Sequence, residues 1–328
     1  MQRCFAVLPQ ARCDSVLRDI AHGDTVLEER PLLCTYGAYD SEQACYYCVR
    51  SLEAGTRVRL CGRWFCSEPC RIAASAEYLP AMSACSFGRA GARCVRPFHE
   101  LETHCDDIGE RFPLLAMRLA CTALTAALQP RPPPNLARPP PWRGDPLADL
   151  RLLAFANIAR PPPQPWQDVF ALLRRGIDRF AASAAGRSQP TVAAAASALD
   201  LEWYTDVMAR LHVNSFRIDT TRTPTASQSL AALAAAAVAG ASGAGSRATG
   251  SALYLLGSLF NHSCVPNLDV LFPVGNGTLR LRAARAIPAG EQLCIAYLDV
   301  NLPMERRQDK LHFGYGFYCT CPRCLEEL

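Results

Sequence analysis

The sequence predicts an α+β fold in which a β core is split by a cysteine-rich module and a helical segment. Residues 16–33 alternate and branch as β-strands do, and strand character returns at 268–298. Between these stretches, cysteines crowd into residues 45–85 and helical periodicity dominates residues 101–211. A split β core with helical insertions is the simplest arrangement that accommodates this order.

The composition restricts the classes of protein. The chain of 328 residues can bury one substantial core or two small ones, so one composite domain with inserted modules is expected. The net charge of +4 is too small to indicate a nucleic-acid surface. Because Lys310 is the only lysine, we attribute the arginine-rich composition to genomic base composition. No apolar run could span a bilayer and no secretory leader is evident, so we expect a soluble intracellular protein without membrane contact.

The local patterns predict the elements in order. We expect an N-terminal β-hairpin with strands at residues 16–20 and 25–29 and a turn at 21–24. The clearest helices are predicted at 112–128, where apolar residues recur at spacings of three and four, and at 166–182.

The proline runs at 130–134, 139–141 and 161–163 predict loops or stiff spacers, because proline fixes φ and removes a hydrogen-bond donor. Residues 230–250 are rich in alanine and then in glycine and serine, which predicts a frayed helix that runs into a flexible loop.

Strands return at residues 268–272 and 279–285, with Gly275-Asn276-Gly277 as the connecting turn. A third strand is predicted at 292–298, after the turn at 288–291.

Two cysteine pairs predict a zinc site in the first module. Cys45-x2-Cys48 and Cys66-x3-Cys70 have the separations that a tetrahedral zinc ion uses. Disulfides do not persist in a reducing compartment, so clustered cysteines favour metal binding. Buried cysteines without a metal are the alternative, but they leave two close pairs in a polar stretch unexplained.

A second cysteine cluster ends the chain. Cys319-x-Cys321-x2-Cys324 supplies only three thiolates, so a fourth ligand must come from elsewhere in the sequence. Cys264, in the segment Asn-His-Ser-Cys-Val-Pro-Asn, is the candidate.

In this order, the motifs closely resemble those of the SET and MYND domain lysine methyltransferases. The resemblance is greatest to the short members of the family and to plant trithorax-related SET proteins. The segments that carry it are Glu29-Arg30-Pro31, the cysteine pairs of residues 45–70, Asn214–Ile218, Asn261–Asn267, Gly290-Glu291 before Ile295–Asp299, and the cysteine-rich end.

The resemblance implies a SET-domain β core with a pseudoknot, split by a MYND-like zinc finger and a helical insert and closed by a post-SET zinc site. The implied divisions are residues 1–44 and 211–300 for the SET core, 45–85 for the finger, 86–210 for the helical linker and 301–328 for the post-SET segment.

A MYND finger usually holds a second zinc ion, and here that second site is eroded. Val58 and Leu79 stand where the family has a cysteine and a histidine, which leaves only Cys61 and Cys85 as ligands. We therefore expect one Zn²⁺ in the finger and one in the post-SET segment.

The resemblance also implies S-adenosylmethionine-dependent methylation of a lysine in a protein substrate, a histone tail or another protein. Tyr297 and Tyr315 match the catalytic tyrosines of the lysine channel. The positions that match cofactor-binding residues are Asn214, Asn261, His262, Tyr297, Phe317 and Arg12. A narrow apolar and aromatic channel suits this chemistry, because it disfavours the ammonium form of lysine and orients the amine.

One departure from the family pattern bears on activity. The family begins its SET region with a Gly-x-Gly turn, and the equivalent segment here is Ala11-Arg12-Cys13. Replacing both glycines adds two Cβ atoms where the cofactor is expected to lie, which would lower its affinity. Three explanations are open: other residues rebuild the turn, Met1 is not the true start, or the activity has been lost. A catalytically silent scaffold that binds proteins through its finger and proline segments is therefore the alternative function.

The remaining expectations are coarse. The finger lacks the histidine pair and recognition-helix pattern of a zinc finger that reads DNA, so no direct nucleic-acid contact is expected. We expect a monomer in the nucleus, the cytoplasm or both.

Overall fold

The structure is a computed structural model that describes residues 16–37, 43–52, 55, 57–88, 91–128, 150–219 and 249–328. The side chains of the hairpin at 84–95 and of residue 219 are not part of this description. The predicted loops at 130–134 and 139–141, residues 230–248 of the predicted frayed helix, and Arg12 lie outside the described residues.

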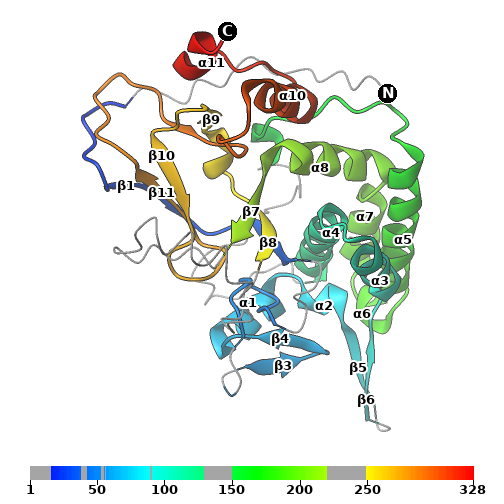
Figure 1. Ribbon diagram of the computed structural model, residues 1–328. Helices are drawn as coiled ribbons and strands as arrows, with labels where there is room; N and C mark the ends of the chain where they lie inside the picture. The colour runs from blue at the N-terminus through cyan, green and yellow to red at the C-terminus, as the bar shows by residue number, and fades with distance from the viewer. Residues whose placement is uncertain are drawn as a thin grey trace.

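Strands from both ends of the chain form the β core (Figure 1). One antiparallel sheet has the order β1 (Thr25–Glu29), β11 (Leu279–Ala283), β10 (Leu268–Leu271). A second has the order β2 (Leu33–Tyr36), β8 (Thr249–Leu253), β7 (Ser215–Asp219). The short strand β9 (Asn261–His262) pairs in parallel with β12 (Cys294–Ile295). Non-local pairing thus joins segments that lie on either side of the insertions.

The helices of the insert gather on one side of the strands (Figure 1). They are α3 (His99–Ile108), α4 (Phe112–Leu128), η1 (Leu150–Leu152), α5 (Gln164–Ala181), α6 (Ala184–Arg187), α7 (Pro190–Ala198) and α8 (Leu201–Asn214). Every residue of α4 from Pro113 to Thr125 is buried, including Arg118, so this stretch of the helix presents no side to solvent. Helix α5 approaches α3 closely at Gly176, where a Cβ atom would lie 2.3 Å from Cδ1 of Phe98.

The finger lies at the opposite end of the molecule from the C-terminus (Figure 1). It contains β3 (Val58–Leu60), β4 (Arg63–Phe65) and α1 (Glu68–Glu77). Helix α2 (Leu79–Met82) and a hairpin of β5 (Ala84–Gly88) and β6 (Gly91–Val95) follow. The Gly277 N–H donates to the Cys48 carbonyl (2.8 Å), so the β10–β11 turn contacts the finger directly.

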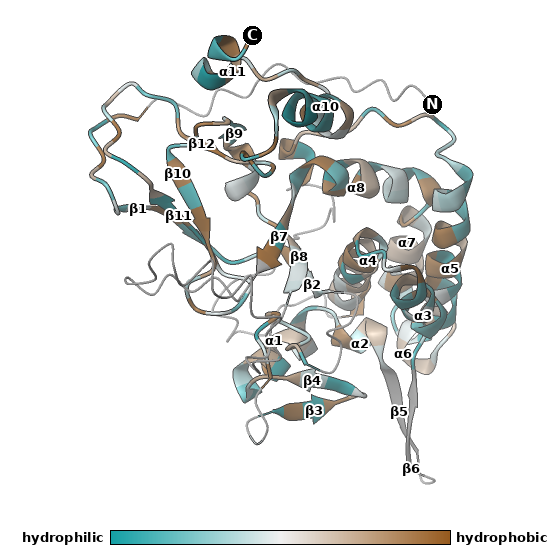
Figure 2. Cartoon of the chain, viewed as in Figure 1, coloured by the Kyte–Doolittle hydropathy of each residue, from teal (hydrophilic) through white to brown (hydrophobic). Residues whose placement is uncertain are grey.

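The C-terminal segment lies beside β9 (Figure 1). It consists of α10 (Met304–Tyr315) and α11 (Pro322–Glu326). Figure 2 shows α10 as a largely hydrophilic helix, and its buried residues are Arg307 and Leu311. Among the described residues, none of the helices has the length and apolar character needed to cross a bilayer.

Several sequence predictions are confirmed. Helix α4 spans residues 112–128 as predicted, and α5 begins two residues before the predicted start at 166. Strands β10 and β11 pair on either side of the predicted turn, in which Gly275 has a φ of 62°. The loop at 161–163 precedes α5, where Pro163 is the N-cap.

The predicted N-terminal hairpin is wrong. Strand β1 pairs with β11, whereas the segment from Val16 to Ile20 lies against residues 287–291. The Val16 N–H donates to the Glu291 carbonyl (3.1 Å), and Ile20 and Ile287 exchange two hydrogen bonds of 2.9 Å. The alternating pattern of residues 16–20 correctly indicated an extended segment, but it could not indicate which segment pairs with it. Two further differences are the hairpin of β5 and β6, which the sequence did not predict, and β12, which is shorter than the strand expected at 292–298.

Candidate active site and metal sites

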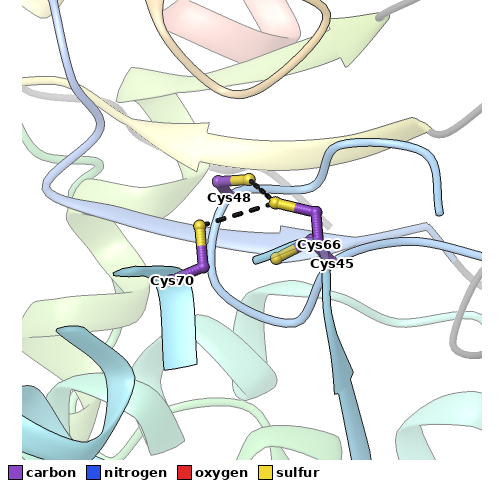
Figure 3. Close-up of side chains that lie close together, drawn as sticks. All are labelled: Cys45, Cys48, Cys66 and Cys70. Atoms are coloured by element: carbon purple, nitrogen blue, oxygen red, sulfur yellow. Dashed lines mark hydrogen bonds between the residues drawn. The ribbon is translucent and has the colours of Figure 1, made fainter. Parts of the chain in front are cut away.

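Four thiols of the finger converge on one point (Figure 3). The sulfur atoms of Cys45, Cys48, Cys66 and Cys70 all lie within 4.8 Å of one another. The Sγ atoms of Cys48 and Cys70 each lie 3.6 Å from Sγ of Cys66. A tetrahedral zinc with Zn–S bonds of about 2.3 Å would place its sulfurs about 3.8 Å apart. The arrangement therefore fits one zinc ion, and the four predicted ligands lie together; their role in binding zinc stays a prediction.

The local backbone geometry brings these four thiols together. The Val49 N–H donates to the Cys45 carbonyl (2.9 Å), and Val49 has a φ of 63°, so the chain turns tightly around the first pair. Ser67 caps helix α1 by accepting from the Cys70 N–H (3.5 Å). Cys70 therefore lies in the first turn of α1, where the positive end of the helix dipole favours a thiolate.

The electrostatics of the finger cluster also favour a bound cation. Hydrogen bonding to Cys48 lowers the pKa of Cys45 to about 7, whereas hydrogen bonding to Cys45 raises the pKa of Cys48 and of Cys70. Four thiols so close together cannot all ionise unless a positive charge compensates them. A divalent metal ion supplies that charge.

The positions of the eroded second finger site hold no ligand group in the described part of the chain. Cys61 occupies the β3–β4 turn with a φ of 50°, and Val58 lies on β3. Leu79 is buried in the core at the start of α2. The Cys85 side chain lies outside the description.

The second cluster joins the chain's end to the Asn-His-Ser-Cys segment, as predicted. The sulfurs of Cys264, Cys319, Cys321 and Cys324 lie within 4.8 Å of one another. Sγ of Cys264 is 4.0 Å from that of Cys319 and 3.6 Å from that of Cys324. The donor set again fits a tetrahedral zinc ion.

Burial and hydrogen bonding change the pKa values of the thiols in this second cluster. Burial raises the pKa of Cys264 to about 12. At Cys321 the burial is outweighed by hydrogen bonds from backbone N–H groups, which lower the pKa to about 7. A bound cation would favour the thiolate at every position.

Four aromatic rings, those of His262, Tyr297, Tyr315 and Phe317, lie next to the second cluster. The sequence predicts each of these residues to be catalytic or cofactor-binding. The ring centroids of Tyr297 and Tyr315 are 4.8 Å apart, and those of His262 and Tyr297 are 5.3 Å apart. Phe317 lies 6.3 Å from His262 and 6.5 Å from Tyr315. All four side chains are half-buried, so the cluster keeps a surface that a ligand can reach.

His262 links the ring cluster to the second cysteine cluster. Its Nδ1 accepts from the Tyr297 N–H (3.0 Å), so the proton lies on Nε2, which is 3.4 Å from Sγ of Cys264. Burial, with a contribution from Arg307, lowers the pKa of His262 to about 4. The imidazole is therefore neutral near pH 7, and both of its nitrogens are engaged within the protein.

The two asparagines of the Asn261–Asn267 segment differ in their contacts. Asn267 is buried, and its amide bonds to Glu291 Oε1, the Gln292 carbonyl and the Cys294 N–H, each at 2.8 Å. The half-buried Asn261 side chain makes no hydrogen bond within the described residues. Asn267 is thus committed to the fold, whereas none of the described residues occupies the amide of Asn261.

The same distinction holds for the tyrosines. The Tyr297 hydroxyl donates to the Phe260 carbonyl (2.6 Å), which fixes its ring. The Tyr315 hydroxyl makes no hydrogen bond to any described residue. Burial raises the pKa of Tyr315 above its ordinary value, so this hydroxyl stays protonated.

Asn214 lies at the C-terminal end of α8 and is buried. Its side-chain amide donates to the carbonyls of Ala154 (2.7 Å) and Arg210 (2.8 Å), and its own carbonyl accepts from Ser258 Oγ (3.3 Å). These contacts hold α8 against the turn that precedes Asn261. The cofactor roles of Asn214 and of Arg12, which lies outside the described residues, stay predictions.

Glu29 supports the same turn, and sequence reasoning did not identify this role. Its carboxylate accepts from the N–H groups of Leu255 (2.9 Å), Leu256 (3.1 Å) and Gly257 (2.8 Å). It therefore caps the short helix η2 (Gly257–Leu259), which leads into β9. The Glu29-Arg30-Pro31 segment was noted only as a family motif, and nothing local in it indicates a partner far along the chain.

Comparison with known proteins agrees with this geometry. The SET domain family model matches residues 16–298, so the chain belongs to the SET-domain family. It is similar to the histone-lysine N-methyltransferase ATXR4 of Arabidopsis thaliana, with 26% identity over 94% of this chain and 81% of the relative. A SET and MYND domain-containing protein of Dictyostelium discoideum is 24% identical over 92% of this chain and 77% of the relative.

A third relative matches locally at higher identity. The protein-lysine N-trimethyltransferase SMYD5 of Gallus gallus is 44% identical over 81 residues, which are 24% of this chain and 19% of the relative. The resemblance to SET and MYND domain methyltransferases is therefore confirmed. The domain boundaries and the roles of individual site residues stay predictions.

Proposed function

We propose that this protein is an S-adenosylmethionine-dependent protein-lysine N-methyltransferase with one zinc ion in each cysteine cluster. The observation that carries the proposal is the half-buried cluster of His262, Tyr297, Tyr315 and Phe317 beside Asn261. The amide of Asn261, which has no hydrogen-bond partner among the described residues, suits the polar edges of the cofactor, since an amide both donates and accepts hydrogen bonds. Family membership and the names of the methyltransferase relatives support the same activity.

The residues of the site fit methyl transfer to an amine. S-adenosylmethionine, when bound, supplies an electrophilic methyl group. A lysine with a pKa of about 10.4 is mostly protonated near pH 7, and burial in an apolar environment disfavours that charged form. The fixed ring of Tyr297 and the hydroxyl of Tyr315, which has no partner among the described residues, can hold and orient the neutral amine. Catalysis then rests on positioning and electrostatics, and no protein nucleophile is needed.

A catalytically silent scaffold is the second candidate. It is favoured by Ala11-Arg12-Cys13, where the resembled family has a Gly-x-Gly turn. The two functions differ in one requirement, because a scaffold does not need to bind S-adenosylmethionine.

Calorimetric titration of the zinc-loaded protein with S-adenosylmethionine tests the proposal. We expect saturable binding that is weakened at least tenfold in Asn261→Ala and unchanged in Asn301→Ala, an exposed asparagine whose side chain donates to Asp299. Transfer of a radiolabelled methyl group to lysine-containing proteins would follow. A folded protein that binds no S-adenosylmethionine would support the scaffold instead.

The substrate and the setting are broader proposals. We expect a lysine of a histone tail or of another protein as the acceptor and a monomeric enzyme. We expect it to act in the nucleus, the cytoplasm or both, with no nucleic acid or membrane required.

A further inference from the structure

A completely buried arginine lies beside the second cysteine cluster. Arg307 is on α10 and has 0% of its side chain exposed, which is exceptional for this residue type unless its charge is paired. None of the motifs that identify the family draws attention to it. Its burial beside Cys324 calls for a physical explanation.

The guanidinium contacts three groups from different parts of the C-terminal segment. Nη1 donates to the Leu302 carbonyl (2.6 Å), and Nη2 lies 3.7 Å from Sγ of Cys324. Nη2 also forms an ion pair with Glu327, which Arg323 holds in turn through a bond of 2.7 Å from its Nε. One planar cation thus connects the start of α10, a cluster thiol and the end of α11.

Charge balance explains why a cation is buried here. Four thiolates around Zn²⁺ leave two negative charges uncompensated, and this cluster is largely buried. Water cannot stabilise that excess charge, so a hydrogen bond from a cationic donor to a sulfur has a large effect. The partial pairing with Glu327 orients the guanidinium without removing its contact with Cys324.

The finger provides a comparison within the same molecule. Three of its four cysteines are only half-buried, so solvent can share their charge. In the part of the chain that the structure describes, no arginine or lysine donates to a finger sulfur, and the contacts of these thiols are with one another and with Ser67. The two clusters therefore balance their charge differently.

We infer that Arg307 is a positioning residue of the second zinc site, which holds the four-thiolate ligand set together by donating to Cys324 and offsetting its excess negative charge. The consequence reaches the candidate active site, because Cys264 belongs to this ligand set and contacts His262. This inference rests on the proposed zinc occupancy and does not depend on methyl transfer.

The test compares Arg307→Met, which keeps the length of the side chain but removes the charge, with Arg306→Met at an exposed neighbouring position. The full-length zinc-loaded proteins are titrated with the chromogenic chelator 4-(2-pyridylazo)resorcinol, and alkylation mapped by mass spectrometry identifies which cysteines become reactive. In Arg307→Met we expect one zinc to leave at a chelator concentration about 10- to 100-fold lower than in Arg306→Met. The newly alkylated residues should be Cys264, Cys319, Cys321 and Cys324.

The finger zinc should be released at the same chelator concentration in both variants. Equal release of the second zinc from Arg307→Met and Arg306→Met would overturn the inference. If Arg307→Met does not fold, Arg307→Lys decides, since its compact ammonium cannot reach all three partners. Release of the second zinc from Arg307→Lys at a lower chelator concentration than from Arg306→Met would support the inference, and release at the same concentration would overturn it. A wild-type protein that holds only the finger zinc would instead refute the proposed occupancy.

Discussion

At the scale of single residues, what distinguishes the candidate active site is which polar atoms the fold leaves without a partner. The Tyr297 hydroxyl is bonded to the Phe260 carbonyl, and the nitrogens of His262 are engaged by Tyr297 and Cys264. The amide of Asn261 and the hydroxyl of Tyr315 have no partner among the described residues. We expect these two groups to meet the cofactor and the substrate amine.

The role of Tyr315 makes a prediction about pH dependence. We expect Tyr315→Phe to lower the methylation rate about 10- to 150-fold, which corresponds to the loss of one hydrogen bond of about 1.5–3 kcal/mol. Burial raises the pKa of Tyr315, so its hydroxyl is neutral between pH 7 and about 10. The rate should rise with pH in the same way in both proteins, because only the substrate lysine loses its proton in this range.

Steady-state rates measured from pH 7 to about 10 check this prediction. Tyr318→Phe is the control, because Tyr318 is 61% exposed and its change should leave the rate unaltered. If the wild type showed an additional rise that Tyr315→Phe lacks, Tyr315 would be acting as an ionised base, contrary to this account.

At the scale of elements, β1 and η2 depend on one carboxylate. Glu29 ends β1 and accepts three backbone N–H groups at and before η2, the turn that delivers Asn261 and His262. Removing its charge weakens all three bonds at once. Glu29→Gln should therefore lower the free energy of unfolding by about 1–3 kcal/mol and weaken S-adenosylmethionine binding.

Urea unfolding and calorimetric titration measure the two effects. The matched control is Glu28→Gln, because Glu28 precedes Glu29 on the same strand but pairs with Arg280 at the surface, where a charge pair contributes less than about 1 kcal/mol. Equal stability and equal cofactor affinity in the two variants would show that Glu29 does not organise the turn.

The elements also show how far sequence reasoning extends. Helix α4 was predicted to the residue, because its apolar periodicity is a local property. The N-terminal hairpin failed because residues 16–20 pair with residues 287–291, and a strand pattern does not name its partner. Pairing chosen by non-local contacts is the part of the fold that spacing cannot supply.

The candidate site divides in the same way. Cys264 could be predicted as the fourth thiolate, because a cluster of three demands another ligand and the family motif offered one. The roles of Glu29 and Arg307 could not be predicted, because the groups that each one contacts come close to it only in the folded chain. The three N–H groups that Glu29 binds are 226 to 228 residues away in the sequence.

At the scale of the whole molecule, buried charge connects the finger to the helices and the β core. The Arg118 guanidinium, on α4, donates to the carbonyls of Cys34 and Tyr46, and it lies 4.6 Å from the Tyr46 ring. Arg63 lies 4.1 Å from the same ring and pairs with the buried Glu102. The finger is thus fixed by cations and aromatic rings in addition to its cluster of four cysteines.

This arrangement predicts that a change in α4 weakens the finger's hold on zinc. Tyr46 lies between the ligands Cys45 and Cys48. Arg118→Met leaves its carbonyl with only the longer hydrogen bond from the Tyr78 hydroxyl (3.4 Å), which loosens the loop that carries both thiols. We expect a stability loss of about 3–5 kcal/mol and finger zinc that leaves at lower chelator concentration, although Arg118 touches no finger sulfur. Arg175→Met, which removes a surface pair with Glu100, is the control and should change neither property measurably. Zinc retained as tightly in Arg118→Met as in Arg175→Met would mean that the finger is held by its metal alone and does not depend on α4.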